Sequence, residues 1–181
     1  MSQSERVEGG LRTKGKLIKR STPGRPLISI VTVCLNSEKH LEQTIQSVIQ
    51  QTYDNIEYIL IDGGSTDSTL DIIKKYDEKI DYWLSEPDEG IYDAMNKGSH
   101  YANGDYILYL NSNDYLYDEK SIERALKLGL EEEGPYPLLI AGKVSIAFND
   151  ELLDWIWPVS ERIAYKYNPS HQAVLIHAAI Y

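Results

Sequence analysis

The stretch that decides the fold is Ile28-Ser29-Ile30-Val31-Thr32-Val33-Cys34-Leu35, a nearly continuous apolar and β-branched run that follows Pro26. Such a run is typical of a strand that is buried on both faces, as the strands of parallel sheets are. Asn36 then breaks the pattern. Residues 56–61 repeat it and end at Asp62-Gly63-Gly64-Ser65, where a turn is expected. The two runs predict two buried strands.

Helical patterns alternate with strands along the first 130 residues. Between the two runs, Leu41, Ile45 and Val48 recur at the spacing of one helical face. Further helices are predicted over residues 68–76, 91–102 and 121–131, and further strands over residues 80–85 and 106–110. This alternation predicts an α/β fold with a mostly parallel sheet. Beyond residue 135 the helical spacing stops, and short strands are predicted over residues 138–148, 152–157 and 172–176.

Residues 1–25 differ from the rest of the chain in charge. They hold seven of the 18 Lys and Arg residues but only two of the 28 Asp and Glu residues, and they contain no apolar run. We therefore predict a basic, disordered tail over residues 1–25 and a domain over residues 26–181. The tail lacks the apolar centre of a signal peptide. Contact of the tail with acidic lipid headgroups stays open beside a purely solvated tail.

Charge and composition exclude several classes of protein. A net charge of -10 has the wrong sign for a partner of the nucleic-acid backbone. No apolar stretch approaches the ~20 residues that cross a bilayer. The single cysteine, Cys34, lies in an apolar run, which fits an inert thiol in a reducing compartment. We therefore expect a cytoplasmic protein, and the basic tail leaves open a position at the inner face of the membrane.

Two common nucleotide-binding motifs are absent from the chain. The glycine-rich turn of dinucleotide-binding folds would follow the first strand, where the sequence is Leu35-Asn36-Ser37-Glu38. No Gly-x-x-x-x-Gly-Lys-Ser/Thr motif occurs anywhere. An acidic crevice would instead hold a diphosphate through a divalent cation that bridges carboxylate and phosphate oxygens.

Polar loops follow the predicted parallel strands. Because ligands bind outside the carboxyl ends of such strands, the loops should converge on one crevice. These loops lie at Asn36, at Asp62, at residues 86–90 and at Asn111-Ser112-Asn113-Asp114. In the last of them, Asp114 is the best candidate for a metal ligand. The alternative is that this loop merely forms a turn before the next helix.

An ordered set of motifs resembles the family 2 glycosyltransferases over residues 26–181. The set comprises Ser29-Ile30-Val31-Thr32-Val33, Gln51-Thr52-Tyr53, Asp62-Gly63-Gly64-Ser65-Thr66-Asp67 and the Asn-Ser-Asn-Asp loop. The most specific part is the pair formed by residues 85–98, SEPDEGIYDAMNKG, and Leu110-Asn111-Ser112-Asn113-Asp114. Chance agreement over both segments is improbable.

The resemblance implies a fold and an activity. The fold is the glycosyltransferase A fold, a Rossmann-like αβα sandwich. The activity is transfer of a sugar from a nucleotide-diphosphate sugar to a saccharide or lipid-linked acceptor, with inversion at the anomeric carbon and with help from Mn or Mg. A role in making a bacterial surface polysaccharide would fit.

The resemblance also implies roles for single residues. The loops at Asn36 and Asp62 would hold the base and ribose of the donor, and the alternative for Asp62 is a cap of the following helix. The full set of expected donor-binding residues is Val33, Asn36, Asp62, Gly63, Asp88, Asp93, Asn96 and Asn113. Capping is the alternative for Asp88 too. Lys97 is expected either as a cation for a phosphate or as an exposed lysine.

The chain departs from the family pattern at two points. The metal motif more often ends in two aspartates, whereas here Asn113 stands in the first position and Asp114 is the remaining carboxylate. His171 and Gln172 are expected on the acceptor side, and the general base of relatives follows such a His-Gln pair, beyond Tyr181. We therefore assign no catalytic base. A truncated or non-catalytic nucleotide-sugar-binding module is the alternative function.

Overall fold

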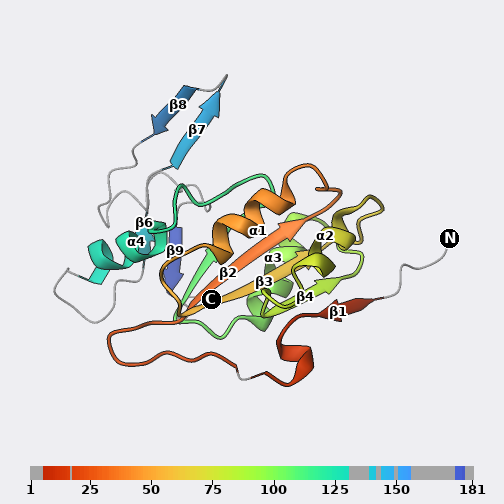
Figure 1. The fold of residues 1–181 in the computed structure, drawn as a ribbon, viewed down its shortest axis with the longest axis horizontal. Coiled ribbons are helices and arrows are strands. Elements are labelled where there is room, and N and C mark those ends of the chain that lie inside the picture. Colours follow the sequence, from red (N-terminus) through yellow and green to blue (C-terminus); the bar gives the residue numbers. More distant parts are fainter. Residues whose placement is uncertain are drawn as a thin grey trace.

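The computed structural model describes residues 6–16 and 18–130, together with four later segments, residues 139–141, 144–148, 151–155 and 174–177. Side chains are described as far as residue 127. Within these residues the chain forms a central sheet with helices on both faces (Figure 1).

Four parallel strands form the middle of the sheet. They are β4 (Tyr82–Ser85), β3 (Ile56–Asp62), β2 (Ile28–Cys34) and β5 (Tyr106–Tyr109), in that spatial order. β2 and β3 pair along their whole length, from Ile28 opposite Ile56 to Cys34 opposite Asp62. Every residue of the four strands is buried, which confirms the predicted mostly parallel sheet and the two buried runs that define it.

Antiparallel strands complete the sheet at its edges. β1 (Val7–Gly9) lies beside β4, and β9 (Val174–His177) lies beside β5, followed by β6 (Leu139–Ala141). β7 (Val144–Phe148) and β8 (Glu151–Trp155) pair with each other as a separate hairpin. The described segments beyond residue 135 are therefore strands, as the loss of helical spacing there predicts.

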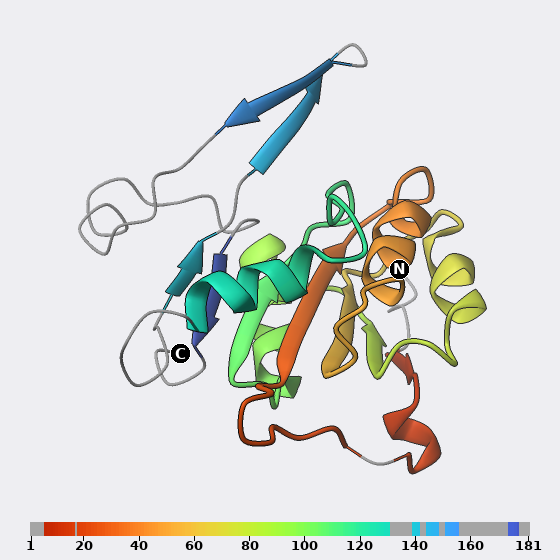
Figure 2. The same cartoon turned by 60° about the vertical axis from the view of Figure 1, so that its left-hand side comes forward.

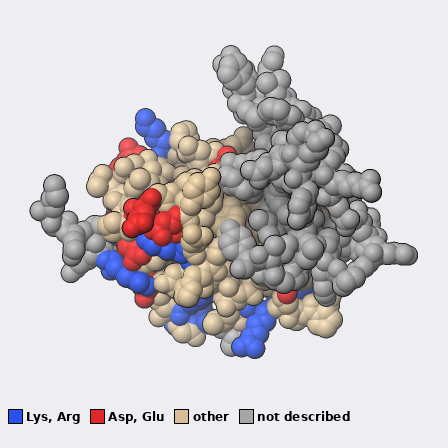
Figure 3. Space-filling model, turned by 180° about the vertical axis from the view of Figure 1, so that it is seen from behind, with Lys and Arg blue, Asp and Glu red and all other residues tan. Residues whose placement is uncertain are grey.

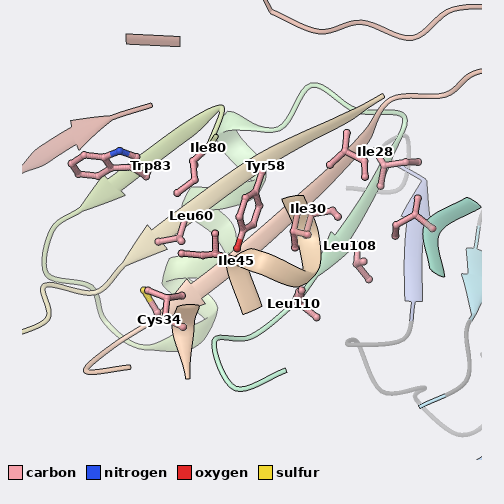
Figure 4. Packing of buried hydrophobic residues seen from close by; sticks show 14 of the residues in the cluster. Ile28, Ile30, Cys34, Ile45, Tyr58, Leu60, Ile80, Trp83, Leu108 and Leu110 are labelled. Carbon is pink, nitrogen blue, oxygen red and sulfur yellow. The ribbon is translucent and has the colours of Figure 1, made fainter. Parts of the chain in front are cut away.

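Two cores fill the space above and below the sheet, and they explain why the strands are apolar throughout. On one face, Ile28 and Ile30 pack with α1 (Leu41–Ile49), α2 (Thr69–Lys75) and α4 (Ser121–Leu130), as Figures 2 and 4 show. On the other face, Val31 and Val33 pack with α3 (Ile91–Tyr101). Gly98 lets α3 lie close to the sheet, since a Cβ there would collide with Val31. The result is the expected αβα sandwich.

The amino-terminal segment is ordered, which corrects the predicted disorder for residues 6–16 and 18–25. β1 extends the sheet, and a 3-10 turn, η1 (Arg12–Lys14), follows it. Arg12 then forms an ion pair with Glu57, a fully buried carboxylate near the amino end of β3. Composition alone suggested disorder because the segment contains no apolar run. The cations are held instead by acidic partners that are distant in sequence.

A second buried acid binds the same segment. The Asp81 carboxylate lies at the amino end of β4, accepts a hydrogen bond from the Tyr58 backbone N–H at 2.8 Å, and pairs with the Lys19 ammonium at 3.0 Å. Six of the seven cations in residues 1–25 form ion pairs, and Arg20 is the remaining one. We call residues 6–16 and 18–25 the amino-terminal strap: β1 lies along β4, and Arg12 and Lys19 reach the acids at the amino ends of β3 and β4.

In the described part of the chain, no helix combines the length and the apolar character needed to cross a membrane.

Candidate functional site

The loops after β2 and β3 are tied together at the carboxyl edge of the sheet, as predicted. The backbone N–H of Asn36 donates to Ser65 Oγ at 2.7 Å, and the Thr66 N–H donates to Asn36 Oδ1 at 2.9 Å. Asn36 has a φ of 49°, the left-handed conformation that asparagine tolerates better than most residues. Asn36 is exposed at this edge, although its side-chain oxygen already accepts a bond from the neighbouring loop.

Hydrogen bonds hold the Asn-Ser-Asn-Asp loop at the same edge of the sheet. Ser112 Oγ lies 2.8 Å from Ser37 Oγ, and the Ser112 N–H donates to the Val33 carbonyl at 3.3 Å. The buried hydroxyl of Thr44, on α1, donates to the carbonyls of Ser112 at 2.9 Å and Asp114 at 2.7 Å. Asn113 is exposed and Asp114 is half-buried. The backbone is therefore fixed while Asn113 faces solvent.

The same loop also makes the turn that the sequence offered as the alternative. The Asp114 N–H donates to the Asn111 carbonyl at 2.9 Å, three residues back. A turn and a metal-binding loop are compatible, because the turn uses backbone groups and a cation would use side-chain oxygens. Among the described residues no group of three or more His, Cys, Asp and Glu side chains could hold a metal by itself.

Asp62 is fully buried at the end of β3 and its carboxylate is used within the chain. It accepts hydrogen bonds from the Ser65 N–H, at 3.1 Å to Oδ2, from the Ser65 hydroxyl, and from Ser85 Oγ at 2.7 Å. These bonds lie in the turn after β3 and reach β4, so Asp62 does not cap α2, which begins at Thr69 with Ser68 as its N-cap residue. Beside it, burial and the nearby Asp62 charge raise the pKa of the Cys34 thiol well above its usual range. The thiol is therefore protonated and unreactive at neutral pH.

Gly63 and Asp88 join the loops after β3 and β4. A Cβ on Gly63 would lie 2.5 Å from Asp88 Oδ2, so only glycine lets the carboxylate come this close. The other oxygen, Asp88 Oδ1, accepts the Gly90 N–H at 2.9 Å just before α3. The Glu86 N–H also donates to the Asp62 carbonyl at 3.1 Å. All four predicted loops therefore meet at one edge of the sheet.

Three further predicted residues lie on β2 and α3. Val33 is a buried core residue, so its side chain packs in the core and its carbonyl supports Ser112. Asn96 and Lys97 lie within α3, inside the helix predicted over residues 91–102, and Asn96 is exposed there. The Asp93 carboxylate accepts the Glu89 N–H at 3.1 Å and pairs with Lys97, and these contacts lower its pKa.

Lys97 is neither exposed nor free. Its side chain is 23% exposed and pairs with Glu86 at 3.0 Å and Asp93 at 3.2 Å. Partial burial lowers its pKa, but the two carboxylates outweigh this and raise the pKa overall. The expectation of an exposed lysine is therefore wrong.

Two of the predicted site residues, His171 and Gln172, lie outside the described residues. The hydroxyl residues that hold the loops were not predicted, although part of the signal is local: Ser37, Ser65 and Ser112 each stand three residues after the last residue of a strand. The set also includes Ser85, the last residue of β4, and Thr44 on α1.

Comparison with known proteins identifies the family. Residues 29–136 match the model of glycosyl transferase family 2, so the chain belongs to this family. A PGL/p-HBAD biosynthesis glycosyltransferase of Mycobacterium bovis is 31% identical over 160 residues, which cover 86% of this chain and 61% of that protein. This chain therefore spans less than two thirds of the length of that relative.

Solved structures share the fold. Residues 1–349 of S. aureus TarS in complex with UDP-GlcNAc align with a TM-score of 0.58 at 19% identity, covering 85% of this chain and 46% of that one. The mannosyltransferase PcManGT of Pyrobaculum calidifontis, in complex with GDP-Man and Mn2+, aligns with a TM-score of 0.54 at 20% identity, covering 60% of this chain and 33% of that one. The glycosyltransferase A fold is thereby confirmed.

Proposed function

We propose that this chain is the donor-binding part of an inverting, metal-assisted glycosyltransferase that uses a nucleotide-diphosphate sugar. The observation that carries the proposal is the meeting of the four motif-bearing loops at one sheet edge. Family membership supports the transferase class, and the similar structures named above hold UDP-GlcNAc or GDP-Man. We propose that Asn36, Asp88 and Asn113 contact the donor directly. Asp62, Gly63, Asp93 and Asn96 complete the expected donor set, and Val33 supports it from the core.

The side-chain oxygens at this edge fit a divalent cation that also binds the phosphates of the substrate. Mg typically takes one or two protein carboxylates and completes its shell with water and substrate phosphates. Asp114 supplies such a carboxylate, and Asn113 adds an amide oxygen on the exposed part of the same loop. A bound Mn or Mg would offset the negative charge of the departing diphosphate. The Thr44 hydroxyl on α1 holds the backbone of this loop through the carbonyls of Ser112 and Asp114.

The acceptor half of the reaction is proposed from the family pattern. The acceptor would be a saccharide or a lipid-linked saccharide, with His171 and Gln172 on its side of the site. A general base must take the proton of the acceptor hydroxyl during in-line attack. We expect that base in sequence beyond Tyr181. We expect the reaction to take place in the cytoplasm, and a position at the inner face of the membrane stays open.

Calorimetry with UDP and GDP, each with and without Mn, tests the donor site. We expect heat of binding with one nucleotide and tighter binding when Mn is present. Release of nucleoside diphosphate from a panel of nucleotide sugars then tests the chemistry. If no nucleotide gave a heat of binding, with or without Mn, the proposed function would be refuted.

A non-catalytic nucleotide-sugar-binding module is the second candidate, and Asn113 in place of a metal-binding aspartate favours it. Loss of one negative charge weakens the attraction for a hard cation. The two candidates differ in turnover: the module binds a nucleotide with Mn but leaves every nucleotide sugar intact. Release of nucleoside diphosphate, by this chain or by a longer chain that carries the general base, would favour the first candidate.

A further inference from the structure

The segment that runs from the loop after β4 into the first turn of α3 is acidic. Glu86, Asp88 and Glu89 lie in the loop and Asp93 lies in α3, so four carboxylates fall within eight residues. On the face seen in Figure 3, acidic side chains gather in one patch with basic side chains beside them. Like charges at this spacing repel one another, so the loop needs a cation to hold it in one conformation.

Lys97 supplies that cation from the second turn of α3. Its ammonium lies 3.0 Å from Glu86 Oε1, 3.2 Å from Asp93 Oδ2 and 3.1 Å from the Pro87 carbonyl oxygen. Asp93 in turn accepts the N–H of Glu89. One ammonium group therefore links the first two residues of the loop to the helix that follows it.

The Lys97 ammonium contacts three oxygen atoms of the chain: it donates a hydrogen bond to the Pro87 carbonyl and forms ion pairs with Glu86 and Asp93. A lysine ammonium donates at most three hydrogen bonds and accepts none. A phosphate of a nucleotide would therefore have to compete with two carboxylates for this one cation. The arrangement therefore favours a role inside the protein over the phosphate contact that the sequence offered as one of two alternatives.

The position of this loop decides where Asp88 lies. Pro87 packs on Gly64, whose φ is +82°, and a Cβ there would lie 3.2 Å from the Pro87 nitrogen. Asp88 follows directly and sits against Gly63. The loop is therefore fitted between the two glycines on one side and Lys97 on the other. If the Lys97 contact were lost, Asp88 would no longer be held against Gly63.

We propose that Lys97 is a positioning residue of the donor site, which holds residues 86–90 so that Asp88 faces the donor. This inference rests on the proposed donor-binding function. It differs from a direct phosphate contact in one measurable way. If Lys97 positions the loop, removal of the charge from Glu86 or Asp93 must weaken donor binding. If Lys97 binds a phosphate, removal of either competing carboxylate must strengthen it.

The test measures the Kd of UDP and of GDP with Mn by calorimetry, together with the thermal midpoint of each variant. We expect Lys97→Met to weaken binding about tenfold, the lower end of the loss typical for residues that orient a ligand-binding group. Glu86→Gln and Asp93→Asn should weaken binding in the same direction. Lys97→Arg should recover most of the affinity, because a guanidinium can span the same two carboxylates.

Lys75→Met is the matched control. Lys75 lies on α2, away from the β4–α3 loop, and also pairs with a carboxylate, that of Glu42 on α1. This variant should leave the Kd unchanged. Tighter binding in Glu86→Gln or Asp93→Asn, or an unchanged Kd in Lys97→Met, would overturn the inference while the wild type still binds. Absence of binding in the wild type would instead refute the donor site itself, and the role of Lys97 with it.

Discussion

At the scale of single residues, the candidate site separates side chains that support the loops from side chains that face solvent. Asp62, Ser85 and Ser112 are buried and bonded within the chain, whereas Asn36 and Asn113 are exposed at the same edge. The buried set fixes backbone positions through hydroxyl and carboxylate hydrogen bonds. The exposed side chains are the ones that a ligand can contact from solution. Substitutions in the two sets should therefore have different effects.

Asp114→Asn should remove the part of nucleotide affinity that depends on Mn and leave the metal-free affinity unchanged. The reason is that an amide lacks the negative charge that attracts a hard cation. Calorimetry with and without Mn gives both values. Asp118→Asn serves as the control and should keep the Mn dependence. Asp118 lies four residues after Asp114, and its carboxylate pairs with Arg124. An equal loss in both metal conditions would speak against Asp114 as a ligand.

Gly63→Ala should weaken nucleotide binding at least several-fold because its new methyl group displaces the Asp88 carboxylate. The carboxylate is the end of a flexible side chain, so the free energy of unfolding should fall by about 1 kcal/mol or less. Binding and urea denaturation measure the two effects. In an Asp88→Ala background the same change should cost almost nothing. A similar cost in both backgrounds would show that the methyl group meets something else.

At the scale of elements, the amino-terminal strap is part of the sheet although it lies outside the residues that match the family model. It contributes β1 as an edge strand and brings Arg12 and Lys19 to two acids at the amino ends of the central strands. A buried carboxylate is costly unless it is paired and hydrogen-bonded. The strap therefore stabilises the edge of the sheet through charge as well as through strand pairing.

Arg12→Met should lower the free energy of unfolding by about 3 kcal/mol, because removal of one partner leaves the buried Glu57 charge unpaired. The double variant Arg12→Met with Glu57→Gln should lose less than the two single variants together. Arg25→Met is the control, since the Arg25–Asp54 pair is exposed and should contribute less than about 1 kcal/mol. Urea denaturation gives all four values. Equal losses for Arg12→Met and Arg25→Met would contradict the proposed role of the strap.

At the scale of the whole molecule, acid should destabilise the fold. Several carboxylates have a lowered pKa in the folded chain; the list is Glu8, Glu42, Asp67, Asp77, Glu78, Asp93 and Asp118. Most of them are exposed, so each contributes little. Asp77 is the most enclosed of them: its carboxylate accepts the Gly10 N–H at 2.7 Å and the Trp83 Nε1–H at 2.6 Å, and it pairs with Lys14 at 2.6 Å.

The direction of the pH effect follows from these contacts. Burial raises the pKa of Asp77, but the bonds from Lys14, Trp83 and Gly10 outweigh it and lower the pKa below the ordinary 3.8. The unfolded chain therefore binds a proton first, and the stability is present above pH 3.8 and lost as the pH falls through the folded pKa. The urea midpoint should drop between pH 5 and pH 3 in the wild type, by a smaller amount in Asp77→Asn. An identical drop in both would exclude Asp77 as a contributor.

The sequence by itself determined the central architecture and the place of the site. The runs at residues 28–35 and 56–61 predict the two fully paired strands, because burial on both faces requires apolar residues at every position. The parallel order of β2, β3, β4 and β5 then brings the loops at Asn36, Asp62 and Asn111–Asp114 to one edge. These features depend on local pattern and on a general rule of topology.

Only the tertiary structure decided which charges meet. Arg12 and Glu57 are 45 residues apart, and no local pattern distinguishes a cation that neutralises a buried acid from one on a disordered tail. Likewise the sequence shows Lys97 in an acidic motif, but its role follows from three acceptors that surround one ammonium. Hydrophobic periodicity can be read from the local sequence. The partner of a charged group depends on the fold, because the free energy of a charge depends on what surrounds it in space.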